Sequence, residues 1–396
     1  MAAVDGEGVI SPQRDQSLPR RAMRVVNWRF ASTAVVLATL SVVFHLTSNG
    51  VFFTPRNLSL LARQASLVAI LAAGVSLLMI MAEIDLSIGG AVLLTGAVAA
   101  ELSVVHGLPI WLGVLAALGA GAVLGAWNGF WVSRFGVPSF VVTLAGLLGF
   151  GGLALMWTGA ATLGPLPQDF VNLSEAFIPR TASYVILIAL GIALVVLALR
   201  RHSVDRRRHG QAEIALLGFR VLTAAILIGL SVWVVGGFLG LPAAVIWVVA
   251  VGGAFSFIAT KTKFGRNAFM IGANREAANL AGINVRRHIF LGFVLMGVLY
   301  GVGGVLLDAR LGVWSPEAGQ YLELDAIAAA VIGGTSLMGG VGTIPGAMVG
   351  ALLLSTIDNG MNLDNVNSFL QQVVKGLILL LAVALDQWAN RRQRRA

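Results

Sequence analysis

Two carboxylates interrupt one of the longest apolar stretches of this 396-residue chain. Glu83 and Asp85 lie in the motif Glu-Ile-Asp-Leu-Ser, residues 83–87, inside a stretch that is otherwise apolar from about 66 to 100. Charged groups at membrane depth are costly, and they usually serve a function. One interpretation is a tight turn with two solvated acids, in which Asp85 or Ser87 caps the next helix. The other is a helix break that lines a transport path.

A second polar segment, Lys261–Arg287, contains a short helix with capping residues at both ends. Asn274 is a suitable N-cap, Glu276 favours the positive end of the helix dipole, and Gly282 fits the position after the last turn. A capped helix of about two turns is not stable alone in water. The segment therefore predicts docking onto a partner, and the alternative is a surface turn without one.

The third segment, 324–346, is dense in glycine. Glycine weakens a continuous helix, so this segment is not expected to be uniform. A kinked or re-entrant segment is tolerated in a membrane only where lipid does not reach the freed backbone groups. A simple turn between two glycine-rich helices explains the pattern equally well.

Motifs of common enzymes are absent from the sequence. None of the lysines follows a glycine, so there is no phosphate-binding loop of the type G-x-x-x-x-G-K-[ST]. There is no H-E-x-x-H, no G-x-S-x-G and no cysteine, and the five histidines are scattered. We therefore expect no catalytic residue, no metal site and no nucleotide hydrolysis by this chain.

The composition defines the elements that must position these segments. The chain is 57% hydrophobic and 11% charged, with a mean hydropathy of +0.87. Soluble domains carry roughly 25% charged residues. The sequence therefore predicts an all-α polytopic membrane protein with glycine-rich helix interfaces. We expect about 12 transmembrane helices (10–12) from apolar runs of spanning length, at 30–47, 58–81, 88–105, 109–132, 138–160, 182–199, 221–240, 242–259, 289–308, 324–339, 341–357 and 369–389.

Basic residues give the orientation. With the N-terminus in the cytoplasm, most of the 27 lysines and arginines fall in cytoplasmic segments, which is the positive-inside pattern. Both termini are then cytoplasmic, and the formal charge of +9 does not indicate a polyanion partner. The basic loop at 200–220 is interpreted as an anchor on anionic lipid.

Glycines spaced four apart predict close helix packing. The series are Gly121, Gly125 and Gly129; Gly342, Gly346 and Gly350; Gly236 and Gly240; and Gly297 and Gly301. A weak repeat at an offset of 250 also relates the pairs at 89–90 and 339–340, and chance explains it as well as two matching broken helices do.

Together the three segments resemble the permease subunits of bacterial ABC sugar importers, in the branch that includes ribose, galactoside and xylose permeases. Residues 83–90 are similar to the family signature I-D-L-S-[VI]-G, and residues 332–342 to I-G-G-T-S-L-x-G-G-x-G. Residues 263–287 resemble the segment F-G-R…I-G-x-N-x-E-A-A-x-x-[SA]-G-I-N-V. The similarity extends from about 55 to 389.

Within that branch the chain is most similar to the xylose permeases. The similarity is carried by 124–131, 137–146, 324–329, 358–361 and the extra basic loop and helix pair at 200–240. Two positions depart from the family pattern. Gly151 follows Phe150 where an arginine is usual, and Pro345 replaces a residue that retains its N–H.

The resemblance implies a permease that moves a monosaccharide, D-xylose, inward across the bacterial inner membrane. The implied partners are a cytoplasmic ABC ATPase, a periplasmic sugar-binding protein, a second copy of the permease and membrane lipid, without nucleic acid. ATP would bind to the ATPase, and this chain would hold no cofactor. The expected parts are a cytoplasmic tail at 1–29, a transmembrane permease domain at 30–389 with a coupling loop at 260–288, and a basic tail at 390–396.

The resemblance also assigns roles to residues. The capped helix would couple the permease to the ATPase, with the expected coupling residues Gly265, Arg266, Gly272, Asn274, Glu276, Ala277, Ala278 and Gly282. Amides and hydroxyls suit the hydroxyl groups of a neutral sugar, and tryptophan can stack on its apolar face. The candidate path residues are Asp85, Ser87, Trp127, Asn128 and Asn359, and helix packing or capping explains each of them equally well.

Three alternatives stay open. A related permease for ribose or galactose fits the same motifs. A proton-coupled secondary transporter explains the length and topology, but it leaves the capped segment unexplained and needs buried acid or histidine relays that are scarce here. A membrane-embedded enzyme lacks a nucleophile or metal cluster in this sequence.

Overall fold

The computed structural model describes residues 33–209 and 214–395. Apart from one short pair of strands, the regular structure in these ranges is helical, as expected. The expected tail at 1–29 lies outside the described residues. Of the expected tail at 390–396, residues up to Arg395 continue the last helix.

After a helix at Thr33–Thr47, the first part of the chain forms α2 to α8. Their bounds are α2 (Pro55–Ile80), α3 (Ile88–Ala100) with a π-helical turn η1 (Glu101–Val105), α4 (Ile110–Phe135), α5 (Ser139–Thr158), α6 (Gln168–Glu175), β1 (Phe177–Ile178), α7 (Arg180–His209) and α8 (Ile214–Gly237).

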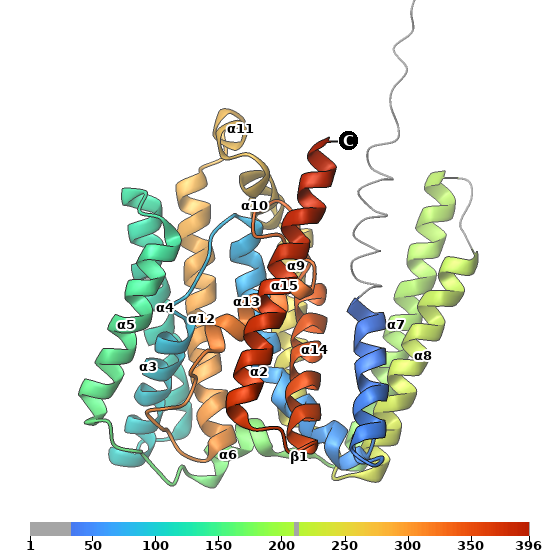
Figure 1. The fold of residues 1–396 in the computed structure, drawn as a ribbon, viewed down its shortest axis with the longest axis horizontal. Coiled ribbons are helices and arrows are strands. Elements are labelled where there is room, and N and C mark those ends of the chain that lie inside the picture. The colour runs from blue at the N-terminus through green and yellow to red at the C-terminus, as the bar shows by residue number, and fades with distance from the viewer. Residues whose placement is uncertain (1–32, 210–213, 396) are drawn as a thin grey trace, which may run out of the picture.

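The second part begins with β2 and contains seven helices. Their bounds are β2 (Leu241–Pro242), α9 (Ala243–Lys261), α10 (Lys263–Ala273), α11 (Arg275–Leu280), α12 (Val285–Leu311), α13 (Leu322–Ile332), α14 (Ile344–Leu363) and α15 (Ser368–Arg395). β1 and β2 pair antiparallel. Figure 1 shows α11 and the C-terminal end of α15 at one end of the molecule, and α6 and β1 at the other.

Seven of the described helices are long and apolar enough to cross a membrane. They are α2, α3 with η1, α4, α5, the first part of α7, α9 and α12, and they coincide with seven of the twelve expected spans. Three shorter apolar helices, at Thr33–Thr47, Val221–Gly237 and Ser368–Ala384, coincide with three more. The prediction of a helical membrane protein with many spans is therefore confirmed.

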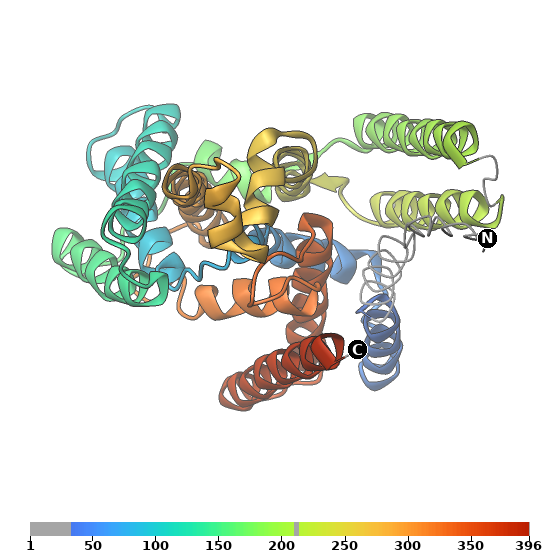
Figure 2. The same cartoon turned by 90° about the horizontal axis from the view of Figure 1, so that it is seen from above.

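The expected span at 324–339 is not a continuous helix. α13 ends at Ile332, and its eleven residues are about 16 Å long, roughly half the thickness of the hydrocarbon core. Seen from above, α13 is drawn side-on whereas α12 is drawn end-on, so α13 lies across the bundle (Figure 2). The glycines explain the break, because Gly334, Gly339 and Gly340 adopt positive φ.

α14 begins after this break, and the Pro345 departure fits its first turn. The N-cap Thr343 accepts a hydrogen bond from the Gly346 amide at 3.1 Å. Proline at this position lacks an N–H that would have no partner within the helix anyway. The two glycine pairs of the weak repeat are not equivalent, since 89–90 lie in the first turn of α3 and 339–340 lie in a loop.

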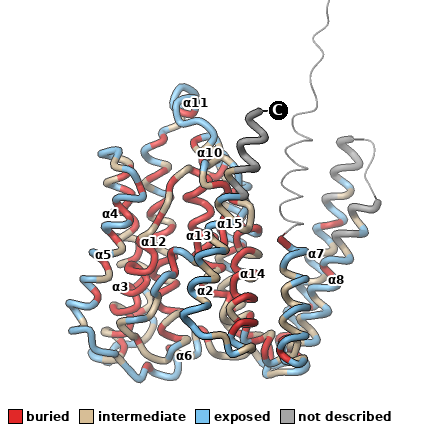
Figure 3. Tube along the Cα trace, viewed as in Figure 1, coloured by how far each residue is buried: buried red, intermediate tan, exposed pale blue. Residues whose placement is uncertain are grey.

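Two long helices form the centre of the bundle. In the most apolar 18-residue stretch of each helix, 89% of the residues of α2 and 72% of those of α12 are buried, against 17% of those of α7. Figure 3 shows this buried centre, with the outer faces of α5, α7 and α8 exposed. The hairpin of α7 and α8 stands at one side (Figure 2). α7 runs as a helix to His209, so much of the basic segment expected as a loop at 200–220 is helical.

The glycine series on α4 packs as predicted. A Cβ at Gly121 would meet the Gly301 amide nitrogen at 2.9 Å, and a Cβ at Gly125 would meet the Gly297 Cα at 2.8 Å. The backbones of α4 and α12 therefore touch through bare glycine faces. This contact fixes the height of α4 against α12, and with it the position of Asn128.

Candidate functional site

The chain leaves α2 in a tight cap and then runs without helix from Met81 to Ser87. The Glu83 amide donates to the Leu78 carbonyl at 3.0 Å, and the Ala82 amide donates to the Met79 carbonyl at 2.9 Å. This is the Schellman pattern, which places the residue after the C-cap in the left-handed region. That residue is Ala82, with φ of +61°, where glycine is usual.

The residues after this cap form a buried polar network. Oδ1 of Asp85 accepts the Ser87 amide at 2.9 Å and the Ser87 hydroxyl at 2.7 Å. Oδ2 of Asp85 accepts the Tyr300 hydroxyl from α12. Nδ2 of Asn128 donates to the Ser87 hydroxyl oxygen at 2.8 Å. Three of the five candidate path residues, Asp85, Ser87 and Asn128, thus meet at the N-terminal end of α3.

A turn with two solvated acids is therefore wrong. Glu83 is 3% exposed and Asp85 is fully buried. Glu83 forms an ion pair with Arg275, the first residue of α11. Burial raises the pKa of the Glu83 carboxyl, and the positive charge of Arg275 opposes that rise. The helix break is a buried element of the bundle that reaches the capped helix directly.

The capped helix itself has the predicted local structure. The Asn274 side chain accepts the Ala277 amide at 2.9 Å, and Gly282 follows the C-cap with φ of +80°. Most of α11 is exposed, and the Leu280 side chain is 85% exposed. Because a helix of this length is not stable alone, its exposed residues, Leu280 among them, are available for contact with a partner.

α10 holds this helix against both irregular segments. The Gly340 amide donates to the carbonyl of Ile80, the last residue of α2, at 2.9 Å. A Cβ at Gly272 would come within 2.6 Å of the Gly340 nitrogen and would also meet the Ile80 carbonyl. Ser76 on α2 and Thr335 also share a hydrogen bond at 2.7 Å. All three motif segments are thus in contact at the α11 end.

The expected coupling residues fall into two groups. Gly265 and Ala278 are buried and Gly272 is partly buried, so these positions contribute to packing, and their role in coupling stays a prediction. The others are exposed at the tip and flank of the segment, namely Arg266, Asn274, Glu276, Ala277 and Gly282.

Two expected path residues lie away from the network. The Trp127 side chain is 54% exposed on the outer face of α4, where it packs edge-on against Trp131 at 5.6 Å between ring centroids. Asn359 on α14 exchanges two hydrogen bonds with Asn57 at the far end of α2, at 2.8 and 3.0 Å. Both residues lie outside this network, and their place on the path stays a prediction.

Sequence reasoning did not single out Tyr300 or the pairing of Arg275 with Glu83. Tyr300 is one of three tyrosines, and a phenol inside an apolar span is a signal for a buried hydrogen bond. Its partner is 215 residues away in the chain, so only the fold reveals it.

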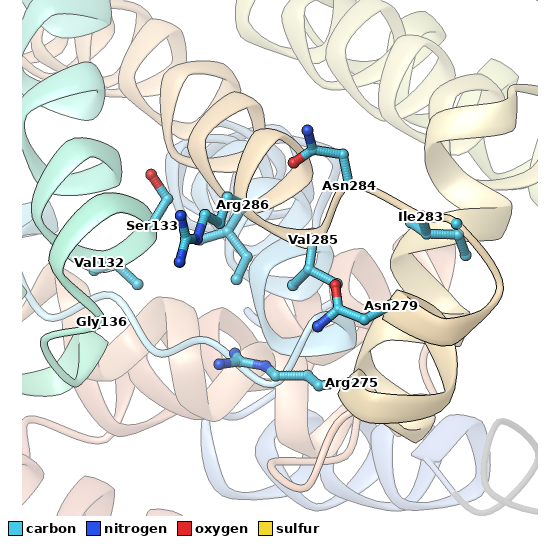
Figure 4. A pocket seen from close by; sticks show the side chains of 11 residues that line it. Val132, Ser133, Gly136, Arg275, Asn279, Ile283, Asn284, Val285 and Arg286 are labelled. Atoms are coloured by element: carbon cyan, nitrogen blue, oxygen red, sulfur yellow. The ribbon is translucent and has the colours of Figure 1, made fainter.

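A cavity of about 600 Å³ lies beside α11. The end of α4, the loop at 282–284 and the start of α12 line it. Figure 4 shows the side chains of Arg275 and Arg286 extending from α11 and α12 toward the end of α4. Among the described residues no group of three histidine, aspartate or glutamate side chains could hold a metal ion.

Comparison with known proteins identifies the family. The family described as "Branched-chain amino acid transport system / permease component" matches residues 57–383. The chain belongs to this permease family. The match extends from the first turn of α2 into α15 and includes all three motif segments.

Several relatives are similar over nearly their whole length. The xylose transport system permease protein XylH of Escherichia coli K12 is 41% identical over 366 residues, 92% of each chain. XylH of Haemophilus influenzae is 38% identical over 369 residues, 92% of this chain and 97% of that one. The ribose import permease protein RbsC of E. coli K12 is 31% identical over 355 residues, 90% and 92% of the two chains. No solved structure matches the chain.

These relatives are permease proteins of transport systems. The expectation of a transport subunit rather than an enzyme is therefore confirmed, as is the resemblance to sugar-importer permeases.

Proposed function

We propose that this chain is the membrane permease of an ABC importer that carries D-xylose into the cytoplasm. The observation that carries the proposal is 41% identity to a xylose permease over 92% of both chains. The ribose permease is less similar, at 31% identity, so ribose is the second candidate. The partners are a cytoplasmic ABC ATPase and a sugar-binding protein on the other side of the bacterial inner membrane.

The contacts at the α11 end support the coupling role. The ATPase binds α11, whose Leu280 is exposed. The Glu83–Arg275 ion pair and the contact of Gly272 with Ile80 and Gly340 carry the movement of α11 to the break at 81–87. ATP binding can shift the permease between two states only if the ATPase binds those states with different affinity. This chain holds no ATP in that scheme.

A pair of permeases encloses the path in this proposal. α5 lies at the edge of the bundle and exposes Gly149 and Gly152, with open space around both. Bare glycines let a second helix approach closely. The polar network of Asp85, Ser87 and Asn128 lies behind α5, where Gly146 packs against Ser87 and Asn128.

Reconstituted transport tests the proposal. The permease is incorporated into proteoliposomes with its ATPase, and sugar is supplied on the binding protein. We expect D-xylose uptake that requires ATP, ATPase and binding protein and that a protonophore does not reduce. Uptake by the permease alone that a protonophore abolishes would instead establish the secondary transporter. Uptake of ribose in preference to xylose would assign the second candidate.

A further inference from the structure

A second cavity, of about 340 Å³, lies between the first turn of α3, the middle of α5 and the segment that leads into α13. Leu93, Leu147 and Pro316 form apolar parts of its wall. Gln320, Tyr321 and Glu323 add polar groups from one side. Apolar walls with a few convergent polar groups are typical of sites for small molecules.

Glu323 carries the strongest signal in this cavity. Its side chain is 6% exposed, and its Oε2 atom has no hydrogen-bond partner among the described residues. Burying a carboxylate oxygen without a donor is unfavourable. The nearest basic contact of this helix, Lys375, pairs with Asp325 and Asp358 instead. The chain itself therefore leaves a strong acceptor unsatisfied at the cavity.

The first turn of α3 is shaped around this oxygen. A Cβ at Gly89 would lie 2.5 Å from Oε2 of Glu323, so a larger residue there would displace the carboxylate. A Cβ at Gly90 would meet the backbone of α5 at Gly151, at 3.0 Å from its nitrogen. The glycine pair next to Ser87 thus opens the cavity immediately beside the Asp85 network.

Tyr321 completes the site. Its backbone has φ of +65°, a conformation that is strained for a residue other than glycine. Such strain persists where the surrounding structure enforces it, and it concentrates at functional sites. The ring of Tyr321 lines the cavity but is half exposed at its rim.

We propose that this cavity is a subsite for the hydroxyl groups of a neutral sugar, with Glu323 as the acceptor. This inference rests on the proposed function. A carboxylate accepts hydrogen bonds from adjacent sugar hydroxyls, Gln320 both donates and accepts, and the Tyr321 ring faces the C–H surface of the sugar. A metal ion is a poor alternative occupant, since the described residues supply no further acid or histidine to the cavity wall.

Single-cysteine labelling tests the subsite directly, because the chain has no native cysteine. Ala318→Cys places a thiol at the cavity, and Gly119→Cys places one in open space on α4. The purified permease is labelled with a maleimide in the presence of D-xylose or of sucrose at equal osmolarity. We expect D-xylose to slow labelling of Ala318→Cys at least about threefold and to leave Gly119→Cys unchanged.

Combining Glu323→Gln or Glu323→Asp with Ala318→Cys tests whether the Glu323 carboxylate is the group that accepts hydrogen bonds from the sugar. We expect Glu323→Gln to abolish the protection without lowering the melting temperature, and Glu323→Asp to weaken it. Protection that is unchanged in Glu323→Gln would overturn the role of Glu323, as would a lower melting temperature with protection intact. No protection with Glu323 present would overturn the subsite, and ATP-driven uptake by the same preparation would still establish the importer.

Discussion

At the residue scale, Asp85 is a carboxylate held by three donors that come from two elements. Ser87 supplies its amide and its hydroxyl, and Tyr300 supplies its phenol. In a low-dielectric interior each polar group that loses its partner lowers the stability of such a network. The cost of removing one donor is the desolvation of the group left behind.

Tyr300→Phe removes one of these donors and leaves the ring in place. We expect the free energy of unfolding to fall by about 1–3 kcal/mol, because Oδ2 of Asp85 loses its donor. We also expect slower D-xylose uptake. Thermal unfolding in detergent and proteoliposome uptake measure the two effects. Tyr184→Phe on α7 is the matched control and should change stability by less than about 0.5 kcal/mol. Equal effects of the two variants would contradict the role of the network.

Residue types alone identified part of this site. Asp85, Ser87 and Asn128 stood out because polar side chains are rare in apolar runs. Trp127 was chosen because tryptophan can stack on the apolar face of a sugar, yet neighbouring residues on a helix point about 100° apart. α4 buries a stripe of small residues that continues to Asn128, so Trp127 faces outward. The packing of α4 against α12 determines that the face with Asn128 is buried and the face with Trp127 is not.

At the element scale, the break after α2, the glycine loop before α14 and the helix pair α10–α11 form one contact. The Glu83–Arg275 ion pair joins the break after α2 to the start of α11. The Gly340 amide joins the glycine loop before α14 to Ile80, the last residue of α2. A displacement of α11 therefore reaches the segment that carries Asp85 without an intervening flexible linker.

Charge reversal at the ion pair tests this connection. Arg275→Glu places a second negative charge beside the buried Glu83 carboxylate, so we expect ATP-driven uptake to fall about tenfold or more. Glu83→Arg should do the same. The double swap restores opposite charges, and we expect it to recover most of the uptake. Rates of uptake and of ATP hydrolysis measure the cycle. Losses that simply add in the double variant would show that the pair does not couple the two elements.

Gly272→Ala tests the backbone contact. The added methyl group meets the Ile80 carbonyl and the Gly340 amide, and overpacking of this kind costs about 1–3 kcal/mol. We expect a lower melting temperature and weaker stimulation of the ATPase by substrate. The control Gly119→Ala on α4 enters open space within a helix, where alanine is favoured over glycine by about 1 kcal/mol. A harmless Gly272→Ala would contradict the tight contact of α10.

Local chemistry explains which elements the sequence predicts. α11 was predicted with its N-cap and its terminal glycine because both signals act within a few residues. α13 was not, because hydropathy over 324–339 is continuous while the glycines end the helix at Ile332. The place of α13 across the bundle depends on α2 and α14, which pack against it.

At the scale of the whole molecule, the chain is a bundle of membrane helices with one exposed, capped helix at its tip. Hydropathy predicted the spans, since seven described helices have the required length and composition. The sequence and structure of the permease alone contain weaker indications of its partner proteins. The clearest is Leu280, an apolar side chain exposed on a short helix that is not stable alone. The central claim is that a partner ATPase covers this helix.

The most direct test measures access to α11 in the assembled complex. Because the chain has no native cysteine, Leu280→Cys introduces a single thiol on α11. A separate variant, Gln168→Cys on α6, introduces a single thiol at the opposite end of the molecule as a control. Ala277→Cys repeats the measurement elsewhere on α11. We predict that adding the ATPase slows maleimide labelling at Leu280→Cys and Ala277→Cys at least about tenfold and leaves Gln168→Cys unchanged. Full reactivity of both α11 thiols in a complex that transports D-xylose with ATP would contradict the claim.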